Sequence, residues 1–265
     1  MTSQRQRRGR TSKVFVERHS AGGHSRRPDE LIVEEPLRIQ LDGTLVSTTM
    51  RTPGHDYELA SGFLHAEGLL DGAPVSSVRY CADGGAIETE FNVVTVETGG
   101  RAPKPTPRLG STTSSCGLCG SDAIDELTDR LTPFAQRGQF EPALLVDIAE
   151  RVRDNQELFK KTGAVHAAAT FDADGTIKLL REDIGRHNAV DKVVGRLLLD
   201  DELPVPAHGL YVSGRASFEM VQKAWAGGFA TLISVSAPSA LAVETAKAAN
   251  MQLAGFVRNG EINVY

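Results

Sequence analysis

The sequence contains few cysteines and few aromatic residues, and it has no long hydrophobic run. Three cysteines in 265 residues exclude a small disulfide-held secreted domain. Because the start also lacks an apolar leader, we expect a protein of the reducing cytoplasm. The longest uncharged stretch, 224–243, contains Gly227, Gly228 and Pro238, which argues against a membrane helix and a membrane partner. Neither G-x-x-x-x-G-K-[ST] nor G-x-G-x-x-G occurs, so ATP hydrolysis and NAD chemistry are disfavoured.

The charge of the chain is unevenly distributed. Residues 1–27 contain eight basic residues and one acidic residue, whereas the remainder contains 21 basic and 33 acidic residues. A basic segment with little apolar content buries too little to offset its ordering entropy, so residues 1–28 are predicted to be a disordered, solubilising tail. Because this stretch lacks a series of aromatic residues for base stacking, no nucleic-acid partner is expected.

The remaining chain is predicted to have a mixed α/β (α+β) fold in two parts. Residues 29–98 show strand patterns around one helix that begins near Asp56, which indicates a smaller, mainly β N-terminal subdomain. Residues 121–265 alternate strand, loop and helix patterns, including one long helix over 142–161, and indicate an α/β domain with a mixed sheet. The intervening residues 99–120 are rich in proline and glycine and are predicted to form a mobile loop.

That loop carries the sharpest chemical motif, Cys116 and Cys119 in C-x-x-C spacing. A helix predicted to begin directly after Cys119 favours the thiolate form of the cysteines. Such a pair suits a dithiol–disulfide oxidoreductase, a zinc site, or a sulfur carrier, whose nucleophilic thiolate accepts the terminal sulfur of a persulfide. The long irregular loop before the motif argues against the first of these. Cys81, in a strand pattern without a partner, is interpreted as a buried structural thiol.

A zinc deaminase is a specific alternative, because His65 and Glu67 match the H-x-E half of the deaminase signature. Cys116 and Cys119 would then complete the set of zinc ligands. However, Ser115 stands where that signature has proline, and His65 falls near the end of its predicted helix. A packed histidine is therefore the preferred interpretation of His65.

Three loops in the C-terminal half lead from a strand to the start of a helix: 182–188, 213–217 and 236–239. Helix N-termini bind anions through free N–H groups and the helix dipole, so together these loops predict a phosphate-bearing ligand. The charges of Arg186 and Arg215, and further along the helices Lys192 and Lys223, would add to the site. His187 is a candidate ligand contact, whereas His166, in a strand beside alanines, is interpreted as structural.

Several ordered sequence blocks resemble the FdhD family, the formate dehydrogenase accessory sulfurtransferases. The resemblance covers residues 31–265 and leaves out the basic N-terminal stretch. The blocks are Met50–Asp56, Glu58–Leu64, Ser114–Gly120, Thr162–His166, Arg181–Lys192, Ser213–Lys223 and Gly255–Arg258.

The resemblance implies a cytoplasmic sulfurtransferase that takes persulfide sulfur from a cysteine desulfurase. It implies transfer to the molybdenum bis(molybdopterin guanine dinucleotide) cofactor of formate dehydrogenase, with Cys116 as the carrier and Cys119 in support. The cofactor, and GDP-like nucleotides, would be held by a C-terminal domain with a cytidine-deaminase-like fold and no structural metal. The family is typically homodimeric. A non-catalytic cofactor chaperone, in which Cys116 is dispensable, is the alternative. The matching cofactor segment comprises Phe256, Val257, Arg258, Asn259, Gly260 and Glu261.

Overall fold

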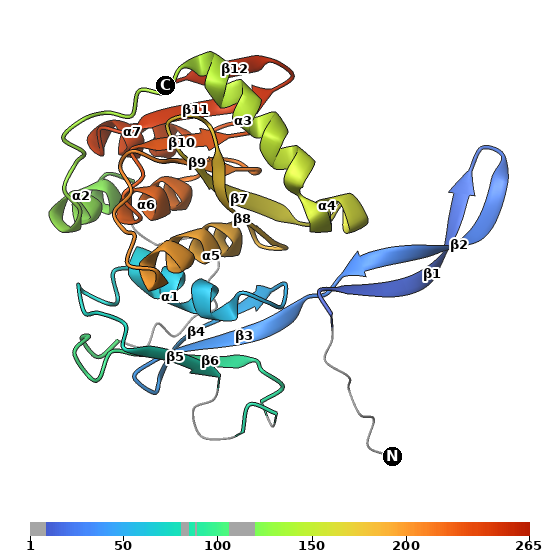
Figure 1. The fold of residues 1–265 in the computed structure, drawn as a ribbon, viewed down its shortest axis with the longest axis horizontal. Helices are drawn as coiled ribbons and strands as arrows, with labels where there is room; N and C mark the ends of the chain where they lie inside the picture. Colours follow the sequence, from blue (N-terminus) through green and yellow to red (C-terminus); the bar gives the residue numbers. More distant parts are fainter. Residues whose placement is uncertain (1–8, 81–84, 88, 106–119) are drawn as a thin grey trace.

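The computed structural model describes residues 9–80, 85–87, 89–105 and 120–265 (Figure 1). These residues contain a two-stranded hairpin, a four-stranded sheet and a six-stranded sheet, together with helices. The mixed α/β fold class predicted from the sequence is confirmed. No helix in the described ranges is long and apolar enough to cross a membrane.

The first two strands, β1 (Thr11–Ser20) and β2 (Gly23–Ile32), form a long antiparallel hairpin that projects from the rest of the molecule (Figure 1). The structure therefore differs from the prediction of a disordered tail over residues 1–28, because residues 11–20 pair with residues 23–32. Opposite charges face each other across the strands, as in the pair Glu17 and Arg26, and a two-residue turn joins them. Low apolar content alone did not reveal this cross-strand complementarity.

The four-stranded sheet has the order β4-β3-β6-β5. Leu37, Ile39 and Leu41 alternate along β3 and are fully buried, as expected of a strand with one core-facing side. The helix α1 supplies Leu59 and Leu64 to the same core cluster. The elements are β3 (Glu35–Leu41), β4 (Thr44–Arg51), α1 (Asp56–Ala66), β5 (Ser77–Tyr80) and β6 (Val93–Glu97).

The six-stranded sheet has the order β12-β11-β10-β9-β7-β8. Strands β9, β10 and β11 are parallel, whereas β7 is antiparallel to both β8 and β9. Consequently β8 runs in the same direction as β9, and four strands end at the same edge. The strands are β7 (His166–Phe171), β8 (Ile177–Asp183), β9 (Gly209–Val212), β10 (Thr231–Ser234), β11 (Gln252–Arg258) and β12 (Glu261–Val264).

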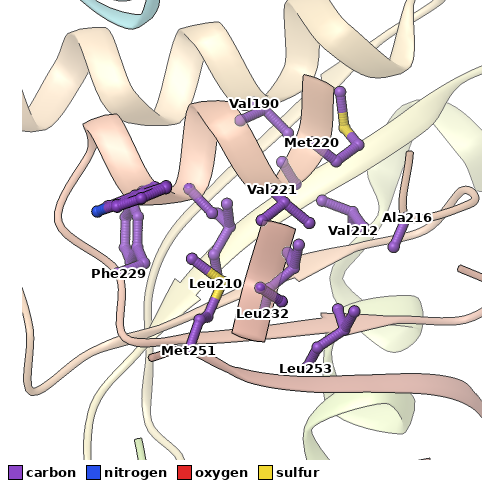
Figure 2. Close-up of a cluster of buried hydrophobic side chains, with 14 of the residues drawn as sticks. Val190, Leu210, Val212, Ala216, Met220, Val221, Phe229, Leu232, Met251 and Leu253 are labelled. Atoms are coloured by element: carbon purple, nitrogen blue, oxygen red, sulfur yellow. The ribbon is translucent and has the colours of Figure 1, made fainter. Parts of the chain in front are cut away.

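Helices cover both faces of this sheet. Val190 and Val221 pack with strand residues such as Leu210 and Leu232 in the larger core cluster (Figure 2). On the other face Ile148 packs against Tyr211 and other strand residues. One face carries α2 (Gly120–Arg130), α5 (Arg186–Leu199), α6 (Phe218–Ala226) and α7 (Ala240–Ala248), and the other carries α3 (Pro142–Asn155), which leads to α4 (Glu157–Thr162).

Helices α1 and α5 form a shared layer between the two large sheets (Figure 1). Their backbones cross so closely that a Cβ at Gly62 would overlap the Asp191 carbonyl oxygen. A Cβ at Gly195 would likewise overlap the Glu58 carbonyl oxygen. Glycine at both positions therefore allows the N-terminal sheet and the six-stranded sheet to pack as neighbours.

The helix predicted over 142–161 is in fact two helices, because Gln156 adopts an extended backbone between α3 and α4. The Glu182 carboxylate explains the new start: it accepts hydrogen bonds from the backbone N–H groups of Leu158 and Phe159, both at 2.9 Å. A carboxylate at a helix N-terminus satisfies free donors and complements the helix dipole. This cap could not be predicted from the local sequence, because Glu182 is more than twenty residues from the helix that it caps.

Candidate functional site

The edge at which β8, β9, β10 and β11 end is the natural ligand-binding edge of the six-stranded sheet. The loops after β8, β9 and β10 lead directly into α5, α6 and α7, as the sequence predicted. His166, the first residue of the antiparallel strand β7, lies at the same edge. The three predicted anion-binding loops are therefore brought together in space.

Two of the three helix starts leave polar groups without partners. The residues before α5 and α6, Gly185 and Ser217, provide no side-chain cap, whereas Ser239 Oγ caps α7 by accepting from Ala242 N at 3.1 Å. The Oγ of Ser217 and the Nε of Arg186 are buried and have no hydrogen-bond partner among the described residues. Free donors at helix starts suit an anionic ligand.

Arg215, in the loop after β9, is exposed to solvent, whereas its neighbour Gly214 is buried. A Cβ at Gly214 would lie 3.4 Å from Arg186 Cδ and 3.5 Å from His166 Nδ1, so this loop packs against both side chains. His187 instead joins α5 to α6: its Nε2 lies 2.7 Å from Glu219 Oε2. That hydrogen bond lowers the pKa of Glu219. It also occupies one ring nitrogen of His187, the residue predicted to contact a ligand.

The segment 256–261 contains the end of β11, the two-residue turn 259–260 and the first residue of β12. Asn259 and Gly260 both have positive φ, 53° and 78°, as an Asn-Gly hairpin turn requires. The Arg258 guanidinium lies 5.9 Å from the centre of the Phe256 ring, while Val257 is buried in the core. Arg258 and Asn259 line a cavity at the edge of the sheet.

This cavity has a volume of about 370 Å³ and lies between the sheet and the helices α3 and α4. Its walls are mainly apolar, and its polar lining includes Glu150, Arg153, Gln156, His166, Tyr211, Ser213, Arg258 and Asn259. Burial raises the pKa of Tyr211 to about 12, so its phenol is neutral and can donate a hydrogen bond. Apolar walls with a few polar groups are typical of a small-molecule site.

His166, interpreted from the sequence as structural, also lines the cavity, so it is a further candidate contact. Its Nδ1 lies 3.4 Å from Ser213 Oγ. Burial lowers the pKa of His166, and the nearby Arg186 and His187 lower it further, so the ring is neutral near pH 7. The α3 residues of the cavity, such as Arg153, had no sequence signal, because only the folded sheet brings them to this edge.

Two lysines whose charges were expected to add to the ligand site are in fact buried in ion pairs. Lys192 Nζ donates to Asp183 Oδ2 at 2.6 Å and to the Thr52 carbonyl oxygen at 3.0 Å. Lys223 Nζ donates to Asp191 Oδ1 at 2.7 Å. Their helices turn these side chains into the protein, so the prediction that their charges add to the ligand site is wrong. Burial lowers the pKa of Lys192 despite its carboxylate partner.

Asp183 connects the ligand edge to the N-terminal sheet. Its Oδ1 accepts from Gly185 N at 2.8 Å and Asn188 Nδ2 at 3.0 Å. Its Oδ2 accepts from Thr52 N at 3.1 Å as well as from Lys192. The loop after β4 is thereby fixed against the start of α5, and the site depends on both sheets.

A second connection between the sheets is the pair of Glu58 on α1 and Arg181 on β8. The Arg181 guanidinium donates two hydrogen bonds to the Glu58 carboxylate, at 2.6 and 2.8 Å. Burial alone would raise the pKa of Glu58, but Arg181 and His55 outweigh it and lower the pKa to about 2. Glu58 is therefore ionised at neutral pH.

This pair predicts an acid-dependent loss of stability. Because the pKa of Glu58 lies below its ordinary value of 4.5 in the fold, its contribution is complete above about pH 4.5 and is lost between there and about pH 2. We expect Glu58→Gln to be less stable than the wild type at pH 7, with the difference shrinking on acidification. Urea unfolding at several pH values measures this; a difference that stays constant from pH 7 to pH 3 would contradict it.

The deaminase alternative finds no support at His65. Its Nε2 lies 2.9 Å from the Ala226 carbonyl oxygen, and burial lowers its pKa, as expected of the packed histidine preferred above. Glu67 lies 3.6 Å from Lys223 Nζ. No cluster of three or more His, Cys, Asp or Glu residues able to hold a metal occurs in the described part of the chain. Cys81, Cys116 and Cys119 lie outside the described residues.

The open mixed sheet, with a polar edge and an adjoining cavity, makes this an α/β protein, and in such folds ligands are typically bound at that edge. The chain belongs to the FdhD/NarQ family, whose sequence pattern matches residues 32–265. It is 46% identical over 264 residues to the protein named sulfur carrier protein FdhD from Streptomyces coelicolor, covering 96% of this chain and 93% of the relative. It is 43% identical over 265 residues to the protein of that name from Corynebacterium efficiens, covering 96% and 92%.

A solved structure shares the fold. It is the crystal structure of a proposed formate dehydrogenase accessory protein from Desulfotalea psychrophila, with a TM-score of 0.75 and 23% sequence identity. The match covers 97% of this chain and 96% of that chain. At this identity the likeness establishes the shared architecture.

Proposed function

We propose that this chain is a cytoplasmic sulfur carrier for the maturation of formate dehydrogenase. The observation that carries the proposal is the near-full-length similarity, at 43–46% identity, to proteins named sulfur carrier protein FdhD, together with the C-x-x-C motif. The low cysteine content is consistent with a reducing compartment, in which thiols stay available.

In the proposed reaction, the Cys116 thiolate attacks the terminal sulfur of a persulfide on a cysteine desulfurase. A new S–S bond forms on Cys116, the S–S bond of the donor breaks, and the donor cysteine leaves as a thiolate. Cys119, three residues away, supports release of the sulfur. The S–S bond of the Cys116 persulfide then breaks, Cys116 leaves as a thiolate, and the zero-valent terminal sulfur passes to the molybdenum bis(molybdopterin guanine dinucleotide) cofactor. This cofactor is cargo rather than a resident group, and in its reduced form it supplies the two electrons that convert the sulfur to sulfide.

The proposed place for the guanine dinucleotide is the edge of the six-stranded sheet. Free donors at the starts of α5 and α6, the exposed guanidinium of Arg215, and the turn 256–261 beside the cavity support it. His187 would contact the ligand through the ring side not engaged by Glu219. Neutral His166 and Tyr211 supply hydrogen bonds inside the cavity without burying a charge.

A direct test is complementation in cells that lack their own FdhD-type protein. Expression of the full chain is expected to restore formate dehydrogenase activity, because the proposed carrier supplies the missing sulfur. Activity that stays at the level of empty-vector cells, with the protein present and folded, would contradict the proposal.

The nucleotide part is tested separately with GDP as the probe. A guanidinium–phosphate hydrogen bond contributes about 1.5–3 kcal/mol, so we expect Arg215→Ala to weaken GDP binding by about tenfold or more. Isothermal titration calorimetry measures the affinity. Arg196→Ala is the matched control, because Arg196 lies in the last turn of α5 and pairs with Asp200. Equal GDP affinity in the Arg215 variant and the control would exclude this loop from the site.

A further inference from the structure

The cavity beside the sheet edge contains two buried polar side chains that lack hydrogen-bond partners. Gln156 is 4% exposed and Tyr211 is 2% exposed, and both line the cavity. Neither the Gln156 amide nor the Tyr211 hydroxyl makes a hydrogen bond with any residue that the structure describes. Polar groups are rarely buried without partners, so both groups indicate a ligand that supplies them.

The fold holds the Gln156 side chain at the cavity. Gln156 has an extended backbone, with φ −76° and ψ 94°, at the break between α3 and α4. Its N–H donates to the Arg153 carbonyl oxygen at 3.4 Å, and its carbonyl oxygen accepts from Lys160 N at 3.2 Å. The Glu182 carboxylate then caps the start of α4. An ordered segment therefore presents the amide to the cavity, as a preorganised binding group requires.

The buried polar groups of the cavity are uncharged, whereas its charged side chains are exposed. Burial raises the pKa of Tyr211 to about 12 and lowers the pKa of His166, so both are neutral near pH 7. Glu150, Arg153 and Arg258 are exposed to solvent. Because an ionised group is costly to bury without a partner, the part of a ligand that enters the cavity is neutral.

The shape and lining of the cavity suit a flat ring. Its volume of about 370 Å³ lies within the range of about 300–1,000 Å³ that is usual for small-molecule sites. Val165 and Val257 contribute apolar walls, and Phe159, which is 42% exposed, adds an aromatic surface. The amide of Gln156 has one donor and one acceptor side by side, so its complement is a ring edge with a carbonyl oxygen next to an N–H group.

We infer that Gln156 is the specificity-determining residue of a pocket for an aminopyrimidinone ring, the flat lactam ring shared by guanine and pterin. Its amide nitrogen donates to the ring carbonyl oxygen, and its amide oxygen accepts from the adjacent ring N–H. The proposed cofactor cargo contains this ring in both its guanine and its pterin parts. The inference therefore rests on the proposed function for the source of the ring.

Calorimetry with methylated probes tests the pairing. Methylation of N1 of GDP removes the N–H that Gln156 is inferred to bind. The wild type is expected to bind GDP at least about fivefold more tightly than 1-methyl-GDP, because the methyl group leaves the buried amide oxygen unpaired. Gln156→Met, which keeps the side-chain length without the amide, is expected to lose most of this preference. The control Gln136→Met changes an exposed glutamine outside this cavity and is expected to retain it.

A second pair of probes identifies the source of the ring. 6-Hydroxymethylpterin and its 3-methyl derivative differ at the corresponding ring N–H. A preference for the unmethylated probe that Gln156→Met abolishes, in either pair, assigns the cavity to that ring and supports the inference.

Two results would overturn the inference. One is a preference of equal size in Gln156→Met and in the control, and the other is a wild-type chain that shows no preference in either pair or binds none of the four probes. GDP binding that requires Arg215 but not Gln156 would remove this pocket and leave the proposed nucleotide site intact. Failure of the complementation assay, in contrast, would reject the proposed function itself.

Discussion

Cys116→Ala is expected to reduce formate dehydrogenase activity in the complementation assay to the empty-vector level. Sulfur carriage requires a nucleophilic thiolate at this position, and alanine cannot form a persulfide. Cys81→Ala is the matched control, since Cys81 was interpreted as a structural thiol, and it is expected to retain activity. Formate dehydrogenase activity and the amount of soluble protein are measured in the same cells.

The result also separates the sulfur carrier from the cofactor chaperone. A chaperone would hold the cofactor through the sheet edge and would not need Cys116. Full activity of Cys116→Ala, at wild-type protein level, would therefore contradict sulfur carriage and favour the chaperone.

Lys192→Met is expected to lower the free energy of unfolding by about 3–5 kcal/mol, since it leaves the fully buried Asp183 carboxylate without its cationic partner. At about 2–4 °C per kcal/mol this corresponds to a fall in Tm of roughly 6–20 °C. The double variant Lys192→Met/Asp183→Asn is expected to recover part of the loss, because it removes the unpaired charge. Thermal and urea unfolding measure both effects.

Lys247→Met is the control for this pair, because Lys247 is exposed in the last turn of α7. We expect it to change stability by no more than about 0.5 kcal/mol. A Lys192→Met protein as stable as this control would show that the buried pair does not hold the loop after β4 to the start of α5.

Local sequence patterns predicted much of the fold because their signals are local. Strand patterns over 31–41 and 45–50, with a turn at Asp42 and Gly43 between them, predicted the hairpin of β3 and β4. The strand–loop–helix rhythm of the C-terminal half identified the mixed sheet. These features depend on side-chain period and turn conformation, which neighbouring residues determine.

The features that the sequence missed depend on contacts between distant residues. The break at Gln156 needs the Glu182 carboxylate, and the burial of Lys192 needs Thr52 from the other sheet. The hairpin of β1 and β2 was missed because the pairing of its two strands is not visible in the low apolar content of the segment. None of these contacts can be recognised from a short stretch of sequence, because the partners are far apart along the chain.

The candidate site was predicted in outline and corrected in detail. The three helix starts were expected and meet at one edge, where Arg258 and Asn259 also line the cavity. The position of His166 beside the cavity was not foreseen, because a histidine in a strand beside alanines gives no sign that its end of the strand borders a cavity. The roles of Cys116 and Cys119 stay predictions from the motif and the family.

The central claim is that Cys116 carries sulfur, and intact-protein mass spectrometry tests it most directly. The purified full chain is incubated with a cysteine desulfurase and L-cysteine, and its mass is measured before and after addition of a reductant. We predict a gain of about 32 Da, one sulfur atom, that the reductant removes and that Cys116→Ala lacks. No gain in the wild-type chain, or an equal reductant-sensitive gain in Cys116→Ala, would contradict the account.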